Sequence, residues 1–260
     1  MLLIMSDMLQ ITTGGRAGDA TRRAFLQGVA ILIVLVPLAT YLGYQIALGA
    51  GAAIPEAAAG LTLALCTIGC ITILSGLFHR DSYPHPRLGL CNVITLFRGA
   101  GIAVMAGLVL TPVATFGWWL AILALALLLL DGLDGWAARR AGLQSPFGAR
   151  FDVETDVAFA LTLAALAVAL GQVGTWFLLL GLLRPLFVTA GHFWPALRAP
   201  LPEARWRKRM AGLQMGIQVV LVSPLLAAPV ATWVGAMLLG AMLLSFAIDL
   251  RWLVRQAQDR

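Results

Sequence analysis

Long runs of apolar residues, separated by short polar connections, dominate the sequence. Each run is long enough to cross the roughly 30 Å of hydrocarbon in a bilayer as one α-helix. We place eight runs at 25–48, 57–78, 92–110, 117–138, 150–171, 176–194, 210–228 and 231–250. The pattern therefore predicts an all-α integral membrane protein with about eight transmembrane helices.

Composition supports a membrane protein. Hydrophobic residues make up 60% of the chain and charged residues only 12%, whereas about a quarter of a soluble domain is charged. The first apolar run is too long for the apolar part of a signal peptide and lacks a clear cleavage site, so we interpret it as a retained span. Residues 1–24 then form a cytoplasmic N-terminal segment.

The basic residues predict the orientation. The connections at 49–56, 111–116, 171–175 and 229–230 contain no Lys or Arg, while the alternate connections and both ends of the chain contain them. The positive-inside rule places both termini in the cytoplasm. The net charge of +6 thus reflects cytoplasmic loops near anionic headgroups and does not indicate a nucleic-acid partner.

Five of the twelve acidic residues fall within one short stretch. Asp131 and Asp134 are three residues apart, and Asp152 and Asp156 are four apart, so each pair shares one face of a helix. A turn at 145–148, rich in Ser, Pro and Gly, joins the two helices. This arrangement predicts that both pairs of carboxylates meet at the cytoplasmic membrane surface.

Four close carboxylates require a cation to remain ionised, and oxygen ligands favour Mg²⁺, Mn²⁺ or Ca²⁺. Gly135 and Ala138 leave room for a ligand beside the helix, and the Arg139 guanidinium suits phosphate. Together these features suggest a nucleotide diphosphate. Solvated charges at helix ends would explain one or two aspartates, but not four in facing register. A cation transporter lined by the aspartates is the alternative from another functional class.

Two spacings resemble the signature of a known family, the CDP-alcohol phosphotransferases (CDP-alcohol phosphatidyltransferases). One is Asp131-x-x-Asp134-Gly135-x-x-Ala138-Arg139, followed after eight residues by Gly148-x-x-x-Asp152-x-x-x-Asp156. The other is Asn92-x-x-Thr95-x-x-Arg98, which resembles the element that begins the six-helix core of the family. The resemblance implies that 79–260 is this core, with a cytoplasmic C-terminus, and that 25–78 adds two helices before it.

The resemblance also implies a role for each residue of the signature. Two Mg²⁺ or Mn²⁺ ions would be held by Asp131, Asp134, Asp152 and Asp156, and Asp156 would also act as the catalytic base. The cytidine nucleotide would contact Gly135, Ala138, Arg139, Gly148, Asn92 and Thr95. Candidates for binding the acceptor or its phosphate are Arg98, Arg205, Arg207 and Lys208.

The implied reaction moves a phosphatidyl group from CDP-diacylglycerol to an alcohol, with release of CMP, in phospholipid biosynthesis. A transferase that moves a headgroup from a donor of the CDP-choline type to diacylglycerol is the alternative within the enzyme class. The acceptor stays open among glycerol 3-phosphate, inositol phosphate, serine, choline and phosphatidylglycerol. The family tends toward homodimers, so the resemblance implies a homodimer in the cell membrane with its site facing the cytoplasm.

Three other features complete the sequence prediction. Glu154 lies two residues from Asp152 and points to nearly the opposite side of the helix, so we expect it outside the metal site. Arg184, inside a span, has either a functional role or a structural pairing with a buried polar group. The cysteines form neither a disulfide framework nor a zinc pattern, and Cys91 is expected in a loop.

Overall fold

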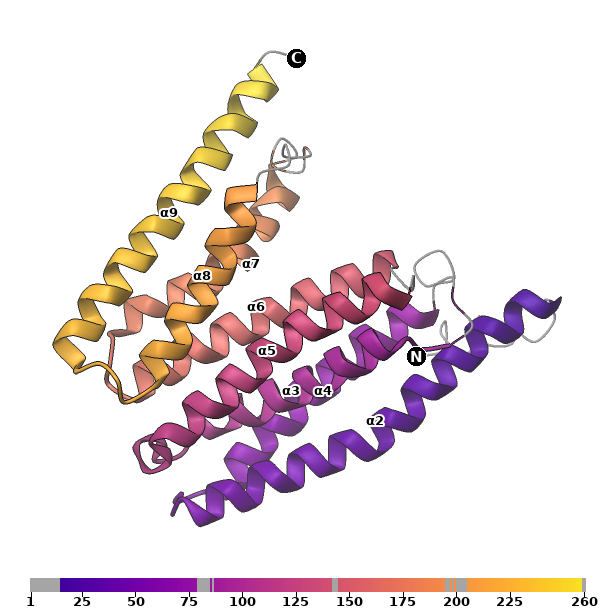
Figure 1. Ribbon diagram of the computed structural model, residues 1–260, viewed down its shortest axis with the longest axis horizontal. Helices are drawn as coiled ribbons and strands as arrows, with labels where there is room; N and C mark the ends of the chain where they lie inside the picture. Colours follow the sequence, from indigo (N-terminus) through magenta and orange to yellow (C-terminus); the bar gives the residue numbers. More distant parts are fainter. Residues whose placement is uncertain are drawn as a thin grey trace. The chain divides into compact units, whose positions relative to one another are not determined.

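The computed structural model of the chain describes residues 15–78, 85, 87–141, 145–194, 197, 199 and 205–258. Within these ranges the side chains at 15–22, 76, 78, 134–139, 141, 205, 208 and 258 are outside the description. The α-helices (Figure 1) are α2 (Gly15–Gly49), α3 (Pro55–Phe78), α4 (Leu90–Leu108), α5 (Trp118–Ala141), α6 (Pro146–Ala169), α7 (Leu178–Phe193), α8 (Arg205–Val222) and α9 (Ala228–Gln258). Two short 3-10 helices, η2 (Val113–Phe116) and η3 (Thr175–Phe177), precede α5 and α7.

Each predicted apolar run coincides with one of these α-helices, and the described residues contain no β-strand. Among the described residues, five helices are long and apolar enough to cross a membrane, at Arg23–Gly49, Pro55–Ser75, Leu90–Leu108, Thr175–Phe193 and Ala228–Ala257. Shorter apolar stretches lie at Trp118–Leu133 and Arg209–Val222. In α5 and α6 the aspartates of the predicted site interrupt the apolar sequence. The prediction of an all-α membrane protein is confirmed.

The chain divides into two compact units. One comprises Met1–Thr111 and Leu129–Thr155, and the other comprises Pro112–Leu128 and Asp156–Arg260. Of the three boundaries between the units, the one at 128/129 falls within α5 and the one at 155/156 falls within α6, while the one at 111/112 falls between α4 and η2.

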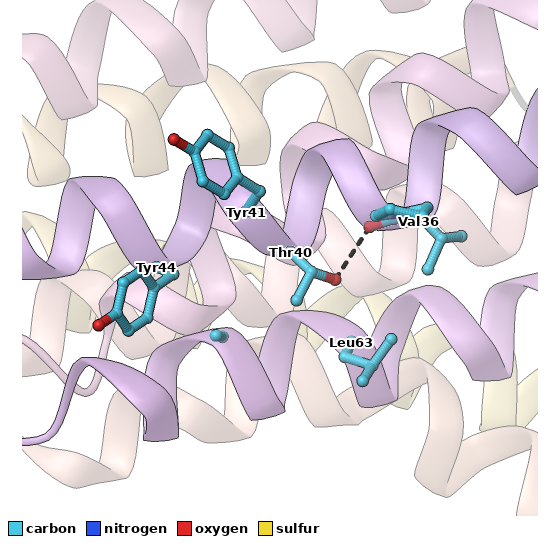
Figure 2. A pocket seen from close by; sticks show the side chains of 7 residues that line it. Val36, Thr40, Tyr41, Tyr44 and Leu63 are labelled. Atoms are coloured by element: carbon cyan, nitrogen blue, oxygen red, sulfur yellow. Dashed lines mark hydrogen bonds between the residues drawn. The ribbon is translucent and has the colours of Figure 1, made fainter.

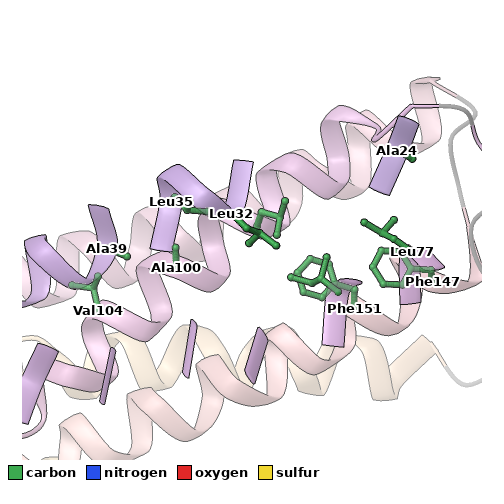
Figure 3. Close-up of a cluster of buried hydrophobic side chains, with 11 residues drawn as sticks. Ala24, Leu32, Leu35, Ala39, Leu77, Ala100, Val104, Phe147 and Phe151 are labelled. Carbon is green, nitrogen blue, oxygen red and sulfur yellow. The ribbon is translucent and has the colours of Figure 1, made fainter. Parts of the chain in front are cut away.

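In the first unit, α2 and α3 pack on α4, and their common core extends to the beginning of α6. Figure 3 shows Leu32 and Leu35 of α2 near Ala100 of α4, and Leu77 of α3 near Phe147 of α6. A hydrogen bond ties the chain just before α4 to α2, because the Leu88 backbone N–H donates to the Gln27 side-chain oxygen at 2.9 Å. The two N-terminal helices therefore support the helix that carries Asn92, Thr95 and Arg98.

Small residues allow α3 and α4 to approach closely, as is common between helices in membranes. A Cβ atom added to Gly107 of α4 would lie 2.5 Å from the Ala58 carbonyl oxygen of α3 and would also collide with the Thr62 hydroxyl. That hydroxyl donates to the Ala58 carbonyl at 2.9 Å and to the Ala103 carbonyl of α4 at 3.3 Å. The interface thus combines one glycine with one interhelical hydrogen bond.

A shallow apolar groove runs between α2 and α3. Figure 2 shows Tyr41 and Tyr44 of α2 and Leu63 of α3 along it. Pro37 lies within α2 beside the groove, and the Thr40 hydroxyl donates to the Val36 carbonyl at 2.9 Å. The residues that line the groove carry no charge, and none of them belongs to the predicted site.

The second unit packs α7, α8 and α9 with the greater part of α6. Gly181 of α7 lies so close to α6 that an added Cβ would be 2.6 Å from the Leu161 Cα. The fully buried Gln218 of α8 donates to the Ala160 carbonyl of α6 at 2.8 Å. Phe187 of α7 meets Phe246 of α9 edge to face, with ring centroids 5.7 Å apart.

One expectation about the loops is wrong. Cys91 lies in the first turn of α4 and is buried, because the helix begins at Leu90, two residues before the predicted span. All three cysteines are free thiols.

Candidate metal and nucleotide site

The start of α6 is fixed by a helix cap. Ser145 precedes the helix, and its hydroxyl oxygen accepts a hydrogen bond from the Gly148 backbone N–H at 2.9 Å. Pro146 follows as the first helical residue, a position where its missing N–H costs nothing. Because the cap sets where α6 begins, it also sets the direction in which Asp152 and Asp156 point from the helix.

Gly148 lies where α4 and α6 meet. A Cβ atom added to it would lie 3.1 Å from both the Asn92 side-chain oxygen and the Ser145 hydroxyl. Asn92 is buried in the first turn of α4. Glycine at this position therefore lets the start of α6 approach the polar start of α4, and two residues of the predicted nucleotide site become neighbours.

Arg98 joins three helices at the site. Its side chain on α4 is fully buried, and its Nη1 atom lies 2.7 Å from the Asp131 Oδ1 of α5 and 3.1 Å from the Asp152 Oδ1 of α6. The two carboxylates are 31% and 42% exposed. The guanidinium thus contacts the aspartates from the protein interior, while part of each carboxylate faces outward.

Three aspartates form a group that can hold a metal ion. One carboxylate oxygen from each of Asp131, Asp152 and Asp156 lies within 4.8 Å of the other two. Asp156 follows Asp152 by one turn of the continuous helix α6, so both carboxylates lie on the same helix face. Three half-exposed carboxylates in this arrangement match the oxygen ligands that Mg²⁺ and Mn²⁺ prefer.

Some predicted site residues lie outside the described side chains. Asp134, Gly135, Ala138 and Arg139 belong to the backbone of α5 and share its helical register with Asp131, but their side chains are not described. The same holds for Arg205 and Lys208 at the start of α8.

The remaining predicted residues have defined surroundings. Thr95 is buried, and its hydroxyl donates to the Cys91 carbonyl one turn earlier at 3.0 Å. Arg207 of α8 pairs with Asp249 of α9 at 2.9 Å. Glu154 and Arg184 are both exposed.

Three ion pairs, two made by Arg98 and one by Arg207, were absent from the sequence prediction. Arg98 was expected to contact an acceptor or its phosphate, and its pairing with the aspartates was not foreseen. A buried arginine needs an acidic partner, and the cluster at 131–156 is the densest group of acidic residues in the chain, so this signal was present. No comparable signal pointed from Arg207 to Asp249.

Comparison with known proteins identifies the family. A model of the family described as CDP-alcohol phosphatidyltransferase matches residues 88–246. The chain belongs to this CDP-alcohol phosphatidyltransferase family. The curated proteins and the solved structures that were searched contain no match to it.

The region that matches the CDP-alcohol phosphatidyltransferase family contains the aspartate group. The matched residues include α4, α5 and α6 and exclude α2 and α3, so the aspartate group and Arg98 lie inside the family region. The protein is therefore a membrane transferase that acts on CDP-alcohols. The family also favours an enzyme over the cation transporter considered from the sequence.

Proposed function

We propose that the protein transfers a phosphatidyl group from CDP-diacylglycerol to an alcohol acceptor, with release of CMP, in phospholipid biosynthesis. The observation that carries this proposal is the group formed by Asp131, Asp152 and Asp156 within the family region. A lipid donor is favoured because the predicted site lies at the membrane surface, where the headgroup of CDP-diacylglycerol would lie. The basic connections support a site that faces the cytoplasm.

The aspartates would hold two divalent ions, Mg²⁺ or Mn²⁺, with Asp134 completing the set of Asp131, Asp152 and Asp156. Bound divalent ions neutralise charge on the pyrophosphate and stabilise the CMP leaving group. The cap at Ser145 and the ion pair to Arg98 orient two of the helices that carry these ligands. Orientation of this kind is a large part of catalysis in phosphoryl transfer.

The donor nucleotide would lie between the starts of α4 and α6 and the end of α5. We assign its contacts to Asn92, Thr95, Gly135, Ala138, Arg139 and Gly148. The close approach of Asn92 to Gly148 supports this assignment, because glycine lets a ligand or a neighbouring backbone approach a helix.

Asp156 would act as the catalytic base. Its carboxylate takes the proton of the acceptor hydroxyl while the acceptor oxygen forms a bond to the phosphatidyl phosphorus. The bond from that phosphorus to the oxygen of CMP breaks, and CMP leaves with the electron pair. A phosphorylated acceptor would be bound by Arg205, Arg207 and Lys208 at the start of α8, and we expect the enzyme to act as a homodimer.

The donor test compares purified protein in detergent with Mn²⁺ and two substrate sets. One set contains CDP-diacylglycerol with glycerol 3-phosphate, inositol phosphate, serine, choline or phosphatidylglycerol, and the other contains CDP-choline with diacylglycerol. We expect CMP release and a new phospholipid only with CDP-diacylglycerol. Release only from CDP-choline would refute the proposed donor.

Asp156→Asn tests the proposed base, with Glu154→Gln as its matched control on the same helix. Removing a general base typically lowers a rate by about 10²–10⁴-fold, so we expect a loss of this size in Asp156→Asn. Glu154 is exposed and outside the aspartate group, so Glu154→Gln should keep a rate within about twofold of wild type. Full activity in Asp156→Asn would exclude its role as the base.

A further inference from the structure

Arg98 is the one fully buried charged side chain among the described residues. It lies within α4, in a helix long and apolar enough to span a membrane. A single atom, Nη1, contacts carboxylates from two different helices, Asp131 of α5 and Asp152 of α6. Arg98 therefore links the three helices α4, α5 and α6 through two ion pairs, and we call this contact the three-helix junction.

Arg98 keeps its charge, so its buried surroundings must supply an opposite charge. Arginine does not lose its proton in proteins, and a buried charge is tolerated only when it is paired. Conversely, Asp131 and Asp152 lie close to Asp156 as well, and carboxylates this close raise one another's energy unless a cation is present. Each side of the junction thus needs the other whenever no metal ion neutralises the aspartates.

Arg98 also lies on the buried side of the carboxylates, opposite the side from which a ligand would approach them. The guanidinium is completely buried, whereas Asp131 and Asp152 are 31% and 42% exposed. A metal ion or nucleotide would therefore meet the carboxylates on their exposed side, with the positive charge of Arg98 behind them. That charge repels a divalent ion, since two positive charges a few ångströms apart interact strongly even near a protein surface.

We propose that Arg98 is a positioning residue that serves as the internal counter-ion of the aspartate group. It holds Asp131 on α5 and Asp152 on α6 against α4 when no divalent ion is bound, and it weakens the binding of free metal. The inference rests on the metal-binding part of the proposed function. It assigns Arg98 to the metal site rather than to the acceptor.

The test measures thermal unfolding of the full chain in detergent, once with EDTA and once with Mn²⁺ and no nucleotide. Arg98→Gln removes the charge, Arg98→Lys keeps it, and Arg251→Gln removes an exposed arginine of α9 as a control. In EDTA we expect Arg98→Gln to lower the Tm by roughly 5 °C, the scale of losing charge-assisted hydrogen bonds to two half-exposed carboxylates in a protein of this size. Arg98→Lys should lose less than half of that, and Arg251→Gln should match wild type.

The metal response separates a counter-ion from a residue that only packs. Because Mn²⁺ would replace the missing positive charge, we expect a larger Mn²⁺-induced rise in Tm for Arg98→Gln than for wild type. In a binding titration, we also expect Arg98→Gln to bind Mn²⁺ at least about tenfold more tightly than wild type does. When Arg98→Gln is added to Asp131→Asn, the Tm in EDTA should fall by less than half of the fall that Arg98→Gln causes in wild type. The reason is that one of the two carboxylates that Arg98 balances is already uncharged.

Several results would overturn the inference. They are an unchanged Tm for Arg98→Gln in EDTA, an equal loss in Arg98→Lys and Arg98→Gln, or an undiminished loss in the Asp131→Asn background. An equal or smaller Mn²⁺ response in Arg98→Gln would also overturn it. Absence of any Mn²⁺ response in wild type and variant alike would instead reject the metal site on which the inference depends. If Arg98→Gln unfolds when metal is removed, we expect the double variant Asp131→Asn/Arg98→Gln to remain folded in EDTA, because one of the unbalanced carboxylates is gone. Unfolding of the double variant as well would overturn the inference.

Discussion

The close contact between α3 and α4 gives a prediction whose size can be worked from the structure. Gly107→Ala places a methyl carbon 2.5 Å from the Ala58 carbonyl oxygen and in collision with the Thr62 hydroxyl. Ordinary contacts begin at 3.4 Å, so the helices must separate by about 0.9 Å. The Thr62 hydrogen bond to the Ala103 carbonyl, already 3.3 Å long, would then be lost.

Both effects destabilise the first unit. Overpacking a tight interface costs about 1–3 kcal/mol, and an interhelical hydrogen bond in a membrane protein contributes about 0.6 kcal/mol. We therefore expect Gly107→Ala to lower the free energy of unfolding by roughly 2–4 kcal/mol. For a chain of this size the corresponding fall in Tm is roughly 4–15 °C.

The assay follows the fraction of monodisperse protein that remains after heating in detergent, detected by tryptophan fluorescence on size exclusion. Gly60→Ala on α3 is the matched control, because a Cβ added to Gly60 meets no atom within 4 Å. The control should leave the Tm unchanged or raise it slightly, since alanine favours a helix more than glycine does. Equal Tm values for the two variants would refute the tight packing of α3 on α4.

Three further substitutions test the site. Ser145→Ala removes the cap of α6 and should lower stability by about 0.5–2 kcal/mol, whereas Ser145→Asp should retain it; equal melting curves for the two would contradict the cap. Gly148→Ala pushes against Asn92 at 3.1 Å, so kcat/KM for the CDP donor should fall roughly tenfold or more, and an unchanged value would exclude this position from the donor site. Arg207→Gln breaks a pair with Asp249 in which the two side chains are only 22% and 17% exposed, so it should lower stability by about 1–3 kcal/mol. Its main effect should be a higher KM for a phosphorylated acceptor, and a lower Tm with an unchanged KM would assign Arg207 to structure alone.

The sequence predicted the elements that depend on local pattern. Apolar runs predicted each α-helix in the described part of the chain, and the spacing of Asp152 and Asp156 correctly placed them one turn apart on the same helix. These features depend on residues within a few positions of one another. The turn predicted at 145–148 was wrong, because Pro146 and Gly148 already belong to the first turn of α6, with Ser145 as its cap.

One contact between helices was predicted, the approach of Asp131 to Asp152 and Asp156 across a short connection, but contacts between more distant segments were not. Nothing in the pattern around Gly107 indicates that Ala58 and Thr62 lie against it, since the approach of two helices depends on the whole interface. Arg98 was assigned to the acceptor in the sequence prediction. Its contacts with Asp131 of α5 and Asp152 of α6 depend on how three helices pack, which the local sequence around Arg98 does not indicate. Helix starts were also shifted, as at Leu90, because a helix extends beyond its apolar stretch into polar residues.

The most direct test of the account measures CMP released from CDP-diacylglycerol by the purified protein, with acceptor present, in Mn²⁺ and after chelation with EDTA. Asp152→Asn serves as the site variant, because Asp152 belongs to the aspartate group and contacts Arg98. The account predicts rapid CMP release by wild type in Mn²⁺, loss of release in EDTA with recovery on adding Mn²⁺ back, and little release by Asp152→Asn. CMP release that is equally fast in EDTA, or undiminished in Asp152→Asn, would contradict it.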